Sequence, residues 1–353
     1  MTMTIHLTTG DLLKQTDVDA IVNTVNCVGV MGKGIALQFK NKWPDNFAAY
    51  HAACKAGQVR PGQMMVFDAG AYAQPHYIIN FPTKDHWRGK SQLAFIRDGL
   101  QDLVDKVRVL GIRSISVPPL GCGNGGLDWS DVRPLIESAF TALPDVDVRL
   151  FEPGDAPAPK AMEVRTHRPK MTPGRAAILK SIETYRDLNY GLTKIEVQKL
   201  GYFLQAAGQN LGLQFEKHLY GPYSEQLRHA LNRMEGHFIV GLGDGNVDSE
   251  IEPAPDALTE ADAFLAQNPD PAIHERLQRL HALIDGFQSP YGMELLSTVH
   301  WVATHDEGIT SAAEAHQAIG QWNARKKQLM QAPHVEAAWQ RLTMAGWLES
   351  RAH

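Results

Sequence analysis

The chain has 353 residues, of which 44% are hydrophobic and 21% are charged, and its formal net charge is −5. One hydrophobic core rarely grows to this length, so we expect two domains. The composition is that of a globular protein, which excludes collagen-like, coiled-coil and wholly disordered chains. The negative net charge argues against a protein that coats nucleic acid by bulk electrostatics.

Three features bear on location and cofactors. No uncharged apolar run approaches the roughly 18 residues that span a bilayer, and the N-terminus lacks the basic start and apolar stretch of a signal peptide. The three cysteines show no C-x-x-C spacing, which fits a reducing compartment. The 15 histidines form no H-E-x-x-H motif and no paired Cys/His spacing. We therefore expect a cytoplasmic protein with no metal, no cofactor and no membrane partner.

Residues 1–155 alternate short apolar runs with helical periods, the pattern of a sheet covered by helices. A helix with one buried stripe is expected from Leu93 to Val107, with Ser91 as its cap. These elements predict a three-layer α/β/α sandwich. The expected strands are rich in Val, Ile and Phe and are bounded by Gly, Pro or Asp; they are Ala20–Val25, Tyr77–Phe81, Ser114–Val117 and Val146–Phe151.

A glycine-rich loop follows the first of these strands and leads into a helix expected over residues 35–40. Backbone N–H groups freed by glycines, together with a helix N-terminus, form an anion site that needs no basic side chain. The loop contains neither G-x-x-x-x-G-K-[ST] nor G-x-G-x-x-G, so on spacing alone a tight structural turn is an equal alternative.

A second glycine-rich loop, over residues 118–129, follows the strand expected at Ser114–Val117. Ligands of open α/β sheets bind outside the carboxyl ends of the strands, where both loops would lie. We therefore expect the two loops to hold one pyrophosphate from opposite sides, with Asn23 and Asn26 near a sugar.

Three short segments follow one another along the chain: Gly10-Asp11-Leu12, Ile21-Val22-Asn23 with Asn26, and Gly121-Cys122-Gly123. Together they resemble the ADP-ribose-binding macrodomain family over about the first 155 residues, which implies a mixed sheet. The resemblance implies that Asp11 binds the adenine amino group, that Leu12 supports the ring and that Asn26 faces the distal ribose. The residues expected to bind ADP-ribose are Gly10, Asp11, Leu12, Asn23, Asn26, Gly32, Lys33, Gly34, Thr83, Gly121, Cys122, Gly123, Asn124, Gly125, Gly126 and Leu127.

Residues 31–39 and 81–84 resemble the hydrolysing branch of that family, which contains terminal ADP-ribose glycohydrolase and the DarG antitoxins. The branch implies that Lys84 is catalytic, whereas a lone lysine at such a rim is usually a solvated charge. A lysine with a lowered pKa could form a Schiff base with the opened ribose or assist as an acid.

The chain departs from the eukaryotic member of this branch in the second glycine loop. That relative has a partner aspartate there, where this chain has Asn124-Gly125-Gly126 and where the nearest acid is Asp128. We expect Asp128 to cap a helix over Trp129–Phe140, with Ser130 as the competing cap. The lysine–aspartate pair is therefore incomplete in this sequence.

Two further features lie near these loops. The polar loop Asp85–Lys90, with Trp87 as its one aromatic residue, has a composition that can stack a base and hold a phosphate of single-stranded nucleic acid. A plain exposed loop fits it equally well. Cys27 and Cys122 are interpreted as small buried residues rather than nucleophiles, because neither has a His partner in the sequence.

Residues 156–174 are rich in proline and contain almost no large apolar residue, so we expect an extended, slightly basic linker. We favour a solvated spacer over a contact with a polyanion. From residue 175 to 353 the pattern changes to long helical periods, which predicts a mostly α-helical second domain. Thr193 and Glu196 form a capping box, and Ser224 caps a further helix.

Residues 199–204 and 219–224 resemble the SocA-like antitoxin domain, whose members neutralise toxins by binding them. The alternative is that they are only core and turn residues, and no catalytic group is evident there. The acidic run over residues 241–263 has no Lys or Arg. We expect it to be either a solvated loop or a surface that competes with DNA for the cationic groove of a toxin.

Together the two resemblances imply a DNA ADP-ribosyl glycohydrolase that removes ADP-ribose from thymidine bases in single-stranded DNA. The expected partners are ADP-ribosylated single-stranded DNA, ADP-ribose and a DarT-like DNA ADP-ribosyltransferase toxin, which the second domain would bind. The alternatives are a reader that binds ADP-ribose without catalysis and a glycohydrolase that acts on ADP-ribosylated protein. Lys84 favours a hydrolase over a reader, because a reader needs no amine at the anomeric carbon.

Overall fold

The structure is a computed structural model that describes residues 5–15, 17–70, 72–154, 163–186, 191–242 and 250–348. Of these residues, those up to His167 form one compact unit and those from Arg168 form a second. In the described part of the chain, none of the helices combines the length and the apolar character needed to span a membrane.

The first unit is built on a mixed sheet. In its described part, neighbouring strands are parallel except for β3 and β4, which are antiparallel. The strands, in order across the sheet, are β1 (Ile5–Thr8), β6 (Asp147–Phe151), β5 (Ser114–Val117), β2 (Ala20–Val25), β4 (Tyr77–Pro82) and β3 (Met65–Asp68). β2 and β5 have the predicted bounds, β4 runs one residue further and β6 begins one residue later. The predicted mixed sheet is confirmed.

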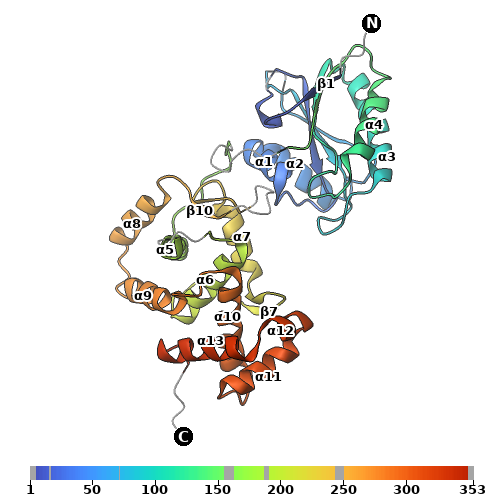
Figure 1. The fold of residues 1–353 in the computed structure, drawn as a ribbon. Helices are drawn as coiled ribbons and strands as arrows, with labels where there is room; N and C mark the ends of the chain where they lie inside the picture. The colour runs from blue at the N-terminus through green and yellow to red at the C-terminus, as the bar shows by residue number, and fades with distance from the viewer. Residues whose placement is uncertain are drawn as a thin grey trace. The chain divides into compact units, whose positions relative to one another are not determined.

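Helices cover both faces of this sheet, as Figure 1 shows. They are α1 (Gly34–Lys42) and α2 (Pro44–Lys55) on one face, and α3 (Leu93–Val109) and α4 (Trp129–Phe140) on the other. Successive side chains of β2 alternate between the faces, as expected for a strand. Ala20 and Val22 pack in the cluster that contains the apolar side chains of α3 and α4, and Ile21 packs with Phe39 of α1. The α/β/α sandwich is confirmed.

Of two helix caps predicted in the first unit, the structure confirms one and contradicts the other. Asp128 caps α4 as predicted, because its carboxylate accepts the backbone N–H of Ser130. The prediction that Ser91 caps α3 is wrong: Gln92 is the N-cap residue and makes no capping hydrogen bond. Ser91 is buried against the second glycine loop, where its backbone N–H donates to the carbonyl of Gly125 at 3.0 Å.

The second unit is mostly α-helical, as predicted. Its helices are α5 (Pro173–Arg186), α6 (Lys194–Ala206), α7 (Glu225–Met234), α8 (Ala257–Gln267), α9 (Ile273–Ile284), α10 (Pro290–His305), α11 (Ala312–Trp322), α12 (Ala324–Leu329) and α13 (Ala332–Met344). Two short hairpins pair β7 (Glu216–His218) with β8 (Gly221–Tyr223) and β9 (Ile239–Val240) with β10 (Glu252–Pro253). The capping box of Thr193 and Glu196 begins α6, and Ser224 caps α7, as predicted.

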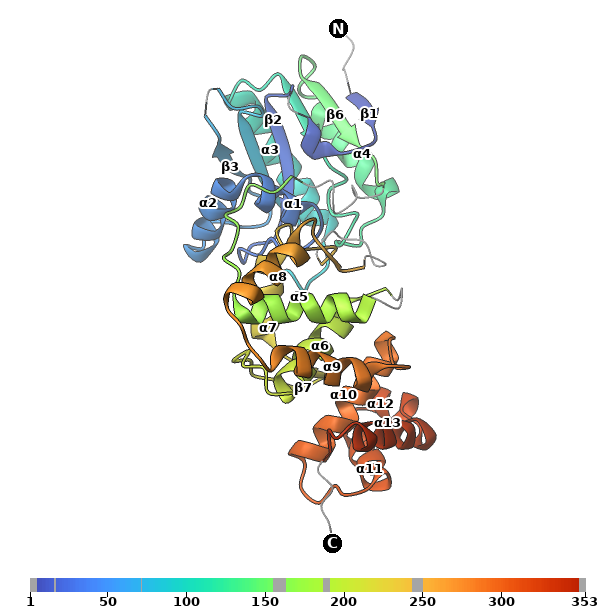
Figure 2. The same ribbon diagram turned by 90° about the vertical axis from the view of Figure 1, so that its left-hand side faces the viewer.

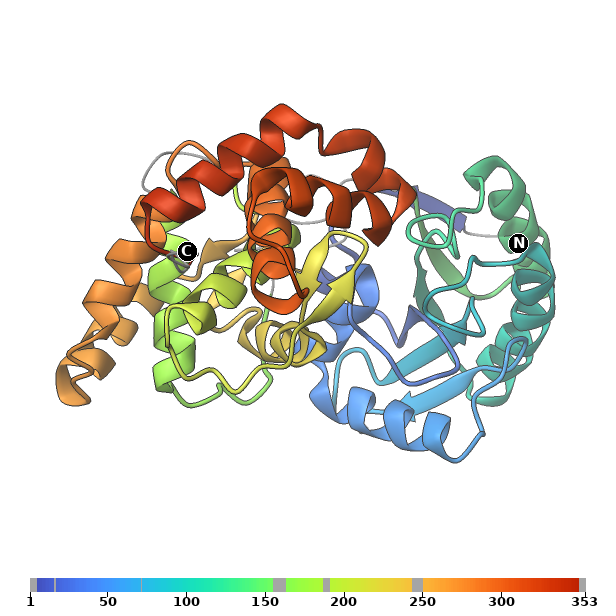
Figure 3. The same cartoon turned by 90° about the horizontal axis from the view of Figure 1, so that it is seen from below.

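α10 is the central helix of this unit, because the side chains from Gly292 to Val302 are all buried. α5 lies beside α8, and Figure 2 shows the two helices side by side. The β7–β8 hairpin lies next to the junction of α11 and α12, which Figure 3 shows from below.

The segment expected as a linker, residues 156–174, lies partly outside the described residues, which resume at 163. Its described part contacts both units in turn. Glu163 pairs with Lys42 of the first unit at 3.1 Å. The guanidinium carbon of Arg168 lies 4.6 Å from the ring centre of Phe238 in the second unit, and α5 begins at Pro173. The described part therefore makes side-chain contacts with each unit, although most of its residues are exposed, as expected for a spacer.

The acidic run also differs from expectation in its described part; residues 243–249 lie outside it. The carboxylates pair with cations on or just before α5: Glu250 and Glu252 with Arg186, Asp262 with Lys180, and Glu260 with Arg168. Much of the run forms β10 and the start of α8. The described part of the run is therefore neither a plain loop nor an unpaired acidic surface, because neighbouring cations pair with four of its carboxylates.

Gly125 occupies the most crowded position of the second glycine loop. A Cβ atom there would lie 2.2 Å from the carbonyl oxygen of Gly121 and 2.3 Å from Ser91 Oγ. We predict that Gly125→Ala lowers the stability of the first unit by about 1 to 3 kcal/mol, because the loop must move. Gly123→Ala is the matched control, since its Cβ would meet no atom within 4 Å. Thermal unfolding of both variants checks this, and equal melting temperatures would contradict it.

Candidate functional site

The candidate site lies where β2, β4 and β5 end. These strands are parallel neighbours, so the loops that follow them leave the sheet at the same edge. Two backbone hydrogen bonds continue the pairing of β2 and β4 into their loops: Thr83 N donates to Val25 O, and Cys27 N donates to Asp85 O, both at 3.0 Å. Lys84 is thereby held between two fixed backbone contacts.

Lys84 connects the end of β4 to the second glycine loop. Its Nζ donates to the carbonyl oxygen of Asn124 at 2.5 Å, and its side chain is half-buried. Burial, and then the positive charge of Lys33, lower the pKa of Lys84. Among the described residues its ammonium makes no ion pair with a carboxylate. The surroundings therefore favour a neutral amine at this position more than water does.

The first glycine loop is shaped by Asn26. Its Nδ2 donates to the carbonyl of Val30 at 2.6 Å, and its Oδ1 accepts the backbone N–H groups of Val28 and Val30. The hydroxyl of Tyr50 on α2 donates to the backbone carbonyl of Asn26 at 2.6 Å. The side chain expected to face the distal ribose thus organises the loop around which such a ribose would lie.

Asn23 belongs to the core rather than to the surface of the site. It is fully buried in β2, and its Nδ2 donates to Oδ1 of Asn80 at 3.0 Å. Asn80 Nδ2 in turn donates to Asn46 Oδ1 of α2 at 2.7 Å. The prediction that Asn23 lies next to a sugar does not agree with this burial. The alternating pattern of a strand cannot show whether a polar residue is buried or faces a site. Here the amides that bury Asn23 come from Asn80 and, through it, from Asn46 of α2, which are distant in the sequence.

The second glycine loop closes on itself through its own backbone. Leu127 N donates to Gly121 O, and Gly126 N donates to Gly123 O. Gly121 has a φ of 74°, a left-handed conformation that glycine adopts without strain.

The tip of this loop lies against the first glycine loop. A Cβ atom on Gly34 would lie 2.9 Å from Nδ2 of Asn124. Lys33 and Gly34 form the start of α1, whose first-turn N–H groups point toward the same region. The structure therefore brings the two loops together, as the sequence analysis expects.

The segment expected to bind adenine forms a short 3₁₀ turn after β1. Asp11 caps this turn, η1 (Leu12–Lys14), because its Oδ1 accepts the N–H of Leu13 at 2.9 Å. Leu12 is buried and packs in the cluster that contains Phe39 of α1. Among the described residues, none donates a hydrogen bond to the second carboxylate oxygen of Asp11.

The remaining candidate residues are two cysteines and the polar loop that follows Lys84. Burial raises the pKa of Cys27 to about 12 and that of Cys122 to about 11, so both are thiols at neutral pH, which agrees with their interpretation as non-nucleophilic residues. Trp87 is 43% exposed, and the guanidinium carbon of Arg88 lies 4.7 Å from its ring centre. The polar loop after Lys84 thus presents an aromatic face and a cation together.

Sequence reasoning missed two residues that support the site. Ser91 packs beneath the second loop, and Tyr50 holds the first loop from α2. Both lie outside the glycine-rich segments, so no local pattern connects them to the loops. The proximity of Lys33 to Lys84 was equally hidden, because 50 residues separate them in the sequence.

The proximity of Lys33 predicts a measurable effect on Lys84. In Lys33→Gln the pKa of Lys84 should rise toward its usual value, because removing a neighbouring positive charge favours the protonated amine. NMR titration of the ¹³Cε resonances of lysine measures this. Lys55→Gln, at the end of α2, is the control and should leave the pKa unchanged. An unchanged pKa in Lys33→Gln would show that solvent screens this repulsion.

Comparison with known proteins agrees with the fold and the order of motifs. Residues 22–136 match the family model described as Macro domain. A DNA ADP-ribosyl glycohydrolase of Thermus aquaticus is 46% identical over 339 residues, which cover 96% of this chain and 93% of that protein. A fusion of a DNA ADP-ribosyl transferase with a DNA ADP-ribosyl glycohydrolase, from Thermosipho africanus, is 32% identical over 43% of each chain.

Among solved structures, the macrodomain of Mycobacterium tuberculosis DarG is 57% identical and covers 43% of this chain and 99% of that one, with a TM-score of 0.42. The similarity to the Thermus aquaticus enzyme extends through both units, at an identity that establishes a common family. The chain belongs to the DNA ADP-ribosyl glycohydrolase family, that of the DarG antitoxins.

Proposed function

We propose that this protein hydrolyses the bond between ADP-ribose and thymidine in single-stranded DNA, and so reverses the action of a DNA ADP-ribosyltransferase toxin. Membership of the glycohydrolase family supports the reaction. The observation that carries the proposal is Lys84, a half-buried amine with a lowered pKa that lies between two glycine loops. We place this activity in the cytoplasm, where bacterial DNA is found and the three free cysteines remain reduced.

ADP-ribose would lie across the edge of the sheet where the two loops meet. The N–H groups at the start of α1 and in the second loop would bind the pyrophosphate. Asp11 would accept a hydrogen bond from the adenine amino group and Leu12 would support the ring. The distal ribose would then lie near the first loop, with its anomeric carbon next to Lys84.

A neutral lysine in this position can act as a nucleophile. The Nζ of Lys84 attacks the anomeric carbon, the bond from this carbon to the base breaks, and its electron pair and the proton lost by the amine go to the base nitrogen. The adduct opens to a Schiff base, which water hydrolyses to free ADP-ribose and the free amine. The carbonyl of Asn124 orients Nζ before the attack, since the two atoms are already hydrogen-bonded.

The carboxylate that assists the eukaryotic relative has no equivalent at its place in the second loop. Asp128 is already engaged, because its carboxylate accepts the backbone N–H and the hydroxyl of Ser130. The proposed route therefore depends on the amine and water alone, without a lysine–aspartate pair.

DNA would extend past the ribose toward the loop that follows Lys84. Trp87 offers an exposed ring for base stacking, and Arg88 offers a cation for a phosphate. A substrate that is a modified protein side chain would not use a stacking ring in this way. This feature favours DNA over ADP-ribosylated protein as the substrate.

We propose that the second unit binds the transferase toxin. The Thermosipho africanus relative, which joins a transferase to a glycohydrolase in one chain, supports a physical association of the two activities. The four described carboxylates of the acidic run are held by neighbouring cations, so they are poor candidates for the main contact.

Replacement of Lys84 tests catalysis. Lys84→Ala should keep ADP-ribose binding largely intact and lower turnover at least about a hundredfold, because the loops bind the ligand and the amine reacts with it. Lys84→Arg should be equally inactive, since a guanidinium stays protonated and is a poor nucleophile. Turnover is measured on thymidine-ADP-ribosylated single-stranded DNA and, separately, on ADP-ribosylated protein.

Three outcomes would contradict parts of this proposal. Wild-type protein that binds ADP-ribose and releases none would be a reader. Faster release from protein than from DNA would make protein the substrate. Full activity in Lys84→Arg would show that only a positive charge is needed there.

Replacement of Asp11 tests the position of adenine. Asp11→Ala should weaken binding of free ADP-ribose by about 1 to 3 kcal/mol, the scale of one lost buried polar contact. Asp11→Ser should weaken it similarly, although serine can still cap η1. Isothermal titration calorimetry measures both affinities. Normal binding by Asp11→Ser alone would reduce the role of Asp11 to capping, and normal binding by both would place the adenine elsewhere.

A further inference from the structure

Cys27 contacts the backbone that carries Lys84 with both of its hydrogen-bond donors. Its thiol donates to the carbonyl oxygen of Lys84, with 3.4 Å between the sulfur and the oxygen. Its backbone N–H donates to the next carbonyl along the chain, that of Asp85, at 3.0 Å. One residue of the first glycine loop therefore binds two successive carbonyls of the segment that contains the lysine.

These contacts replace the regular ladder between β2 and β4. Val25 lies opposite Pro82 in that ladder. In an unbroken register, the N–H of Cys27 would therefore donate to the carbonyl of Thr83. It donates to Asp85 instead, two residues further along the chain. The chain that follows β4 thus forms a bulge that contains the lysine, and a bulge next to an active site redirects a side chain.

The bulge leaves the carbonyl of Lys84 outside the backbone ladder. Among the described residues, no backbone N–H donates to this oxygen, and the thiol of Cys27 is the donor that reaches it. A thiol is a weak donor. Burial raises the pKa of Cys27 to about 12, so the sulfur keeps its proton at neutral pH and the hydrogen bond persists.

The position of the thiol is itself fixed from α2. The hydroxyl of Tyr50 donates to the carbonyl of Asn26, the residue before Cys27, at 2.6 Å. The side chain of Cys27 also packs against the buried apolar cluster that contains Tyr50 and Met31. The direction of the thiol therefore depends on the core of the first unit.

We propose that Cys27 is a positioning residue for Lys84, and that it sets the direction in which the lysine side chain leaves the bulge. This inference rests on the proposed function, in which the amine of Lys84 attacks the anomeric carbon. A lysine side chain is flexible along its length, so it points to one place only if both of its ends are held. Cys27 holds the backbone end, and the carbonyl of Asn124 holds Nζ. An amine held at both ends stays in the geometry that reacts.

Turnover of thymidine-ADP-ribosylated single-stranded DNA by Cys27 variants tests the proposal. Cys27→Ala should lower kcat about five- to tenfold and leave KM and ADP-ribose affinity within about twofold, because it removes one weak hydrogen bond and no ligand-binding group. Cys27→Ser keeps a donor on the same Cβ atom and should retain at least about half of the wild-type kcat. Cys54→Ala is the matched control and should leave kcat unchanged, since Cys54 packs against the same apolar cluster and is not hydrogen-bonded to Lys84.

Two further measurements separate positioning from a general loss of stability. If Cys27 acts through the lysine, adding Cys27→Ala to Lys84→Ala should lower the residual rate no further. The pH at which kcat reaches half of its maximum should rise in Cys27→Ala. Burial lowers the pKa of Lys84, and an amine that is held less firmly in its half-buried place has a pKa nearer that of a solvated lysine.

The other outcomes separate this inference from the proposed function. If Lys84→Ala turns over the substrate at the wild-type rate, the proposed mechanism is wrong and the role of Cys27 fails with it. If Lys84→Ala is inactive and Cys27→Ala has the wild-type kcat, only the positioning role is wrong. Equal losses of kcat in Cys27→Ser and Cys27→Ala would show that the thiol only fills space, and a double variant slower than Lys84→Ala would show that it acts apart from the lysine; either result overturns the proposal. Cys27→Val, which is apolar and has no donor, repeats the test if Cys27→Ala does not fold.

Discussion

The parallel pairing of β2 with β4 and β5 determines where the two glycine loops and Lys84 lie. It brings two glycine loops and Lys84 to one edge of the sheet, although Lys84 lies 40 residues from Asn124 and 50 from Gly34 in the chain. The hydrogen bonds from Thr83 to Val25 and from Cys27 to Asp85 extend this pairing beyond the strands. Without them the lysine would follow a free loop, and its amine would not be fixed against the second glycine loop.

Beneath this edge, buried polar groups replace the apolar contacts usual in a core. Asn80 of β4 is hydrogen-bonded both to Asn23 of β2 and to Asn46 of α2, and Tyr50 reaches from α2 to the first loop. Each of these side chains makes at least one hydrogen bond to a specific partner, although among the described residues none donates to the buried Oδ1 of Asn23. A small shift of α2 would break several of these hydrogen bonds together. The polar layer therefore makes the loop geometry less tolerant of movement than an apolar layer would.

The sequence predicted the fold well because periodicity and caps are local signals. β2, β5 and α4 have the expected bounds, and the caps at Asp128, Thr193 and Ser224 are where local patterns place them. Ser91 was assigned wrongly because a serine before a helix is locally a good cap, whereas the second glycine loop binds it from 34 residues away.

The candidate site was predictable only in part. The loops and Lys84 are brought together as expected, because strand order alone requires it. The burial of Asn23 was not predictable, since it depends on Asn80 and on the position of α2. The pairing of the acidic run with Arg186, Lys180 and Arg168 was equally hidden, because all three cations lie more than 60 residues earlier.

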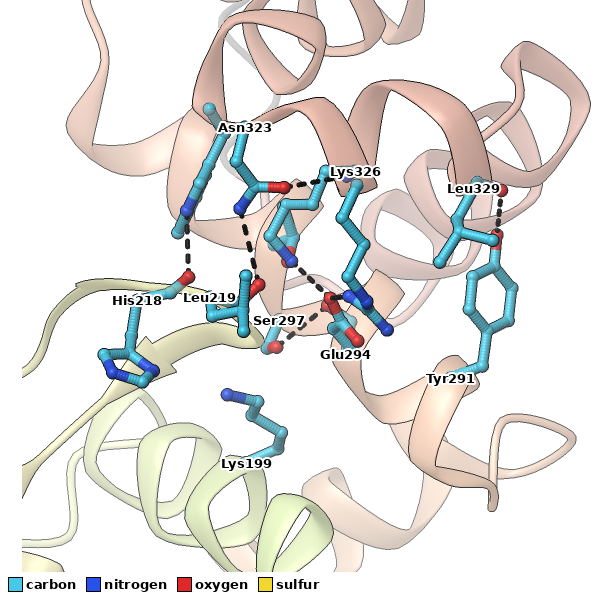
Figure 4. Close-up of polar contacts among 12 residues, drawn as sticks. Lys199, His218, Leu219, Tyr291, Glu294, Ser297, Asn323, Lys326 and Leu329 are labelled. Atoms are coloured by element: carbon cyan, nitrogen blue, oxygen red, sulfur yellow. Dashed lines mark hydrogen bonds and ion pairs between the residues drawn. The ribbon is translucent and has the colours of Figure 1, made fainter. Parts of the chain in front are cut away.

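Lys199, a buried lysine of α6 (Figure 4), links the stability of the second unit to pH. Burial, and then the charge of Lys326, lower the pKa of Lys199 to about 7, far below its value in an unfolded chain. Between these two values the unfolded chain binds more protons than the folded one, so stability from this group increases as pH rises above about 7. Folding of this unit at neutral pH therefore releases protons to the solvent, and acidification opposes the state in which the hairpin is ordered.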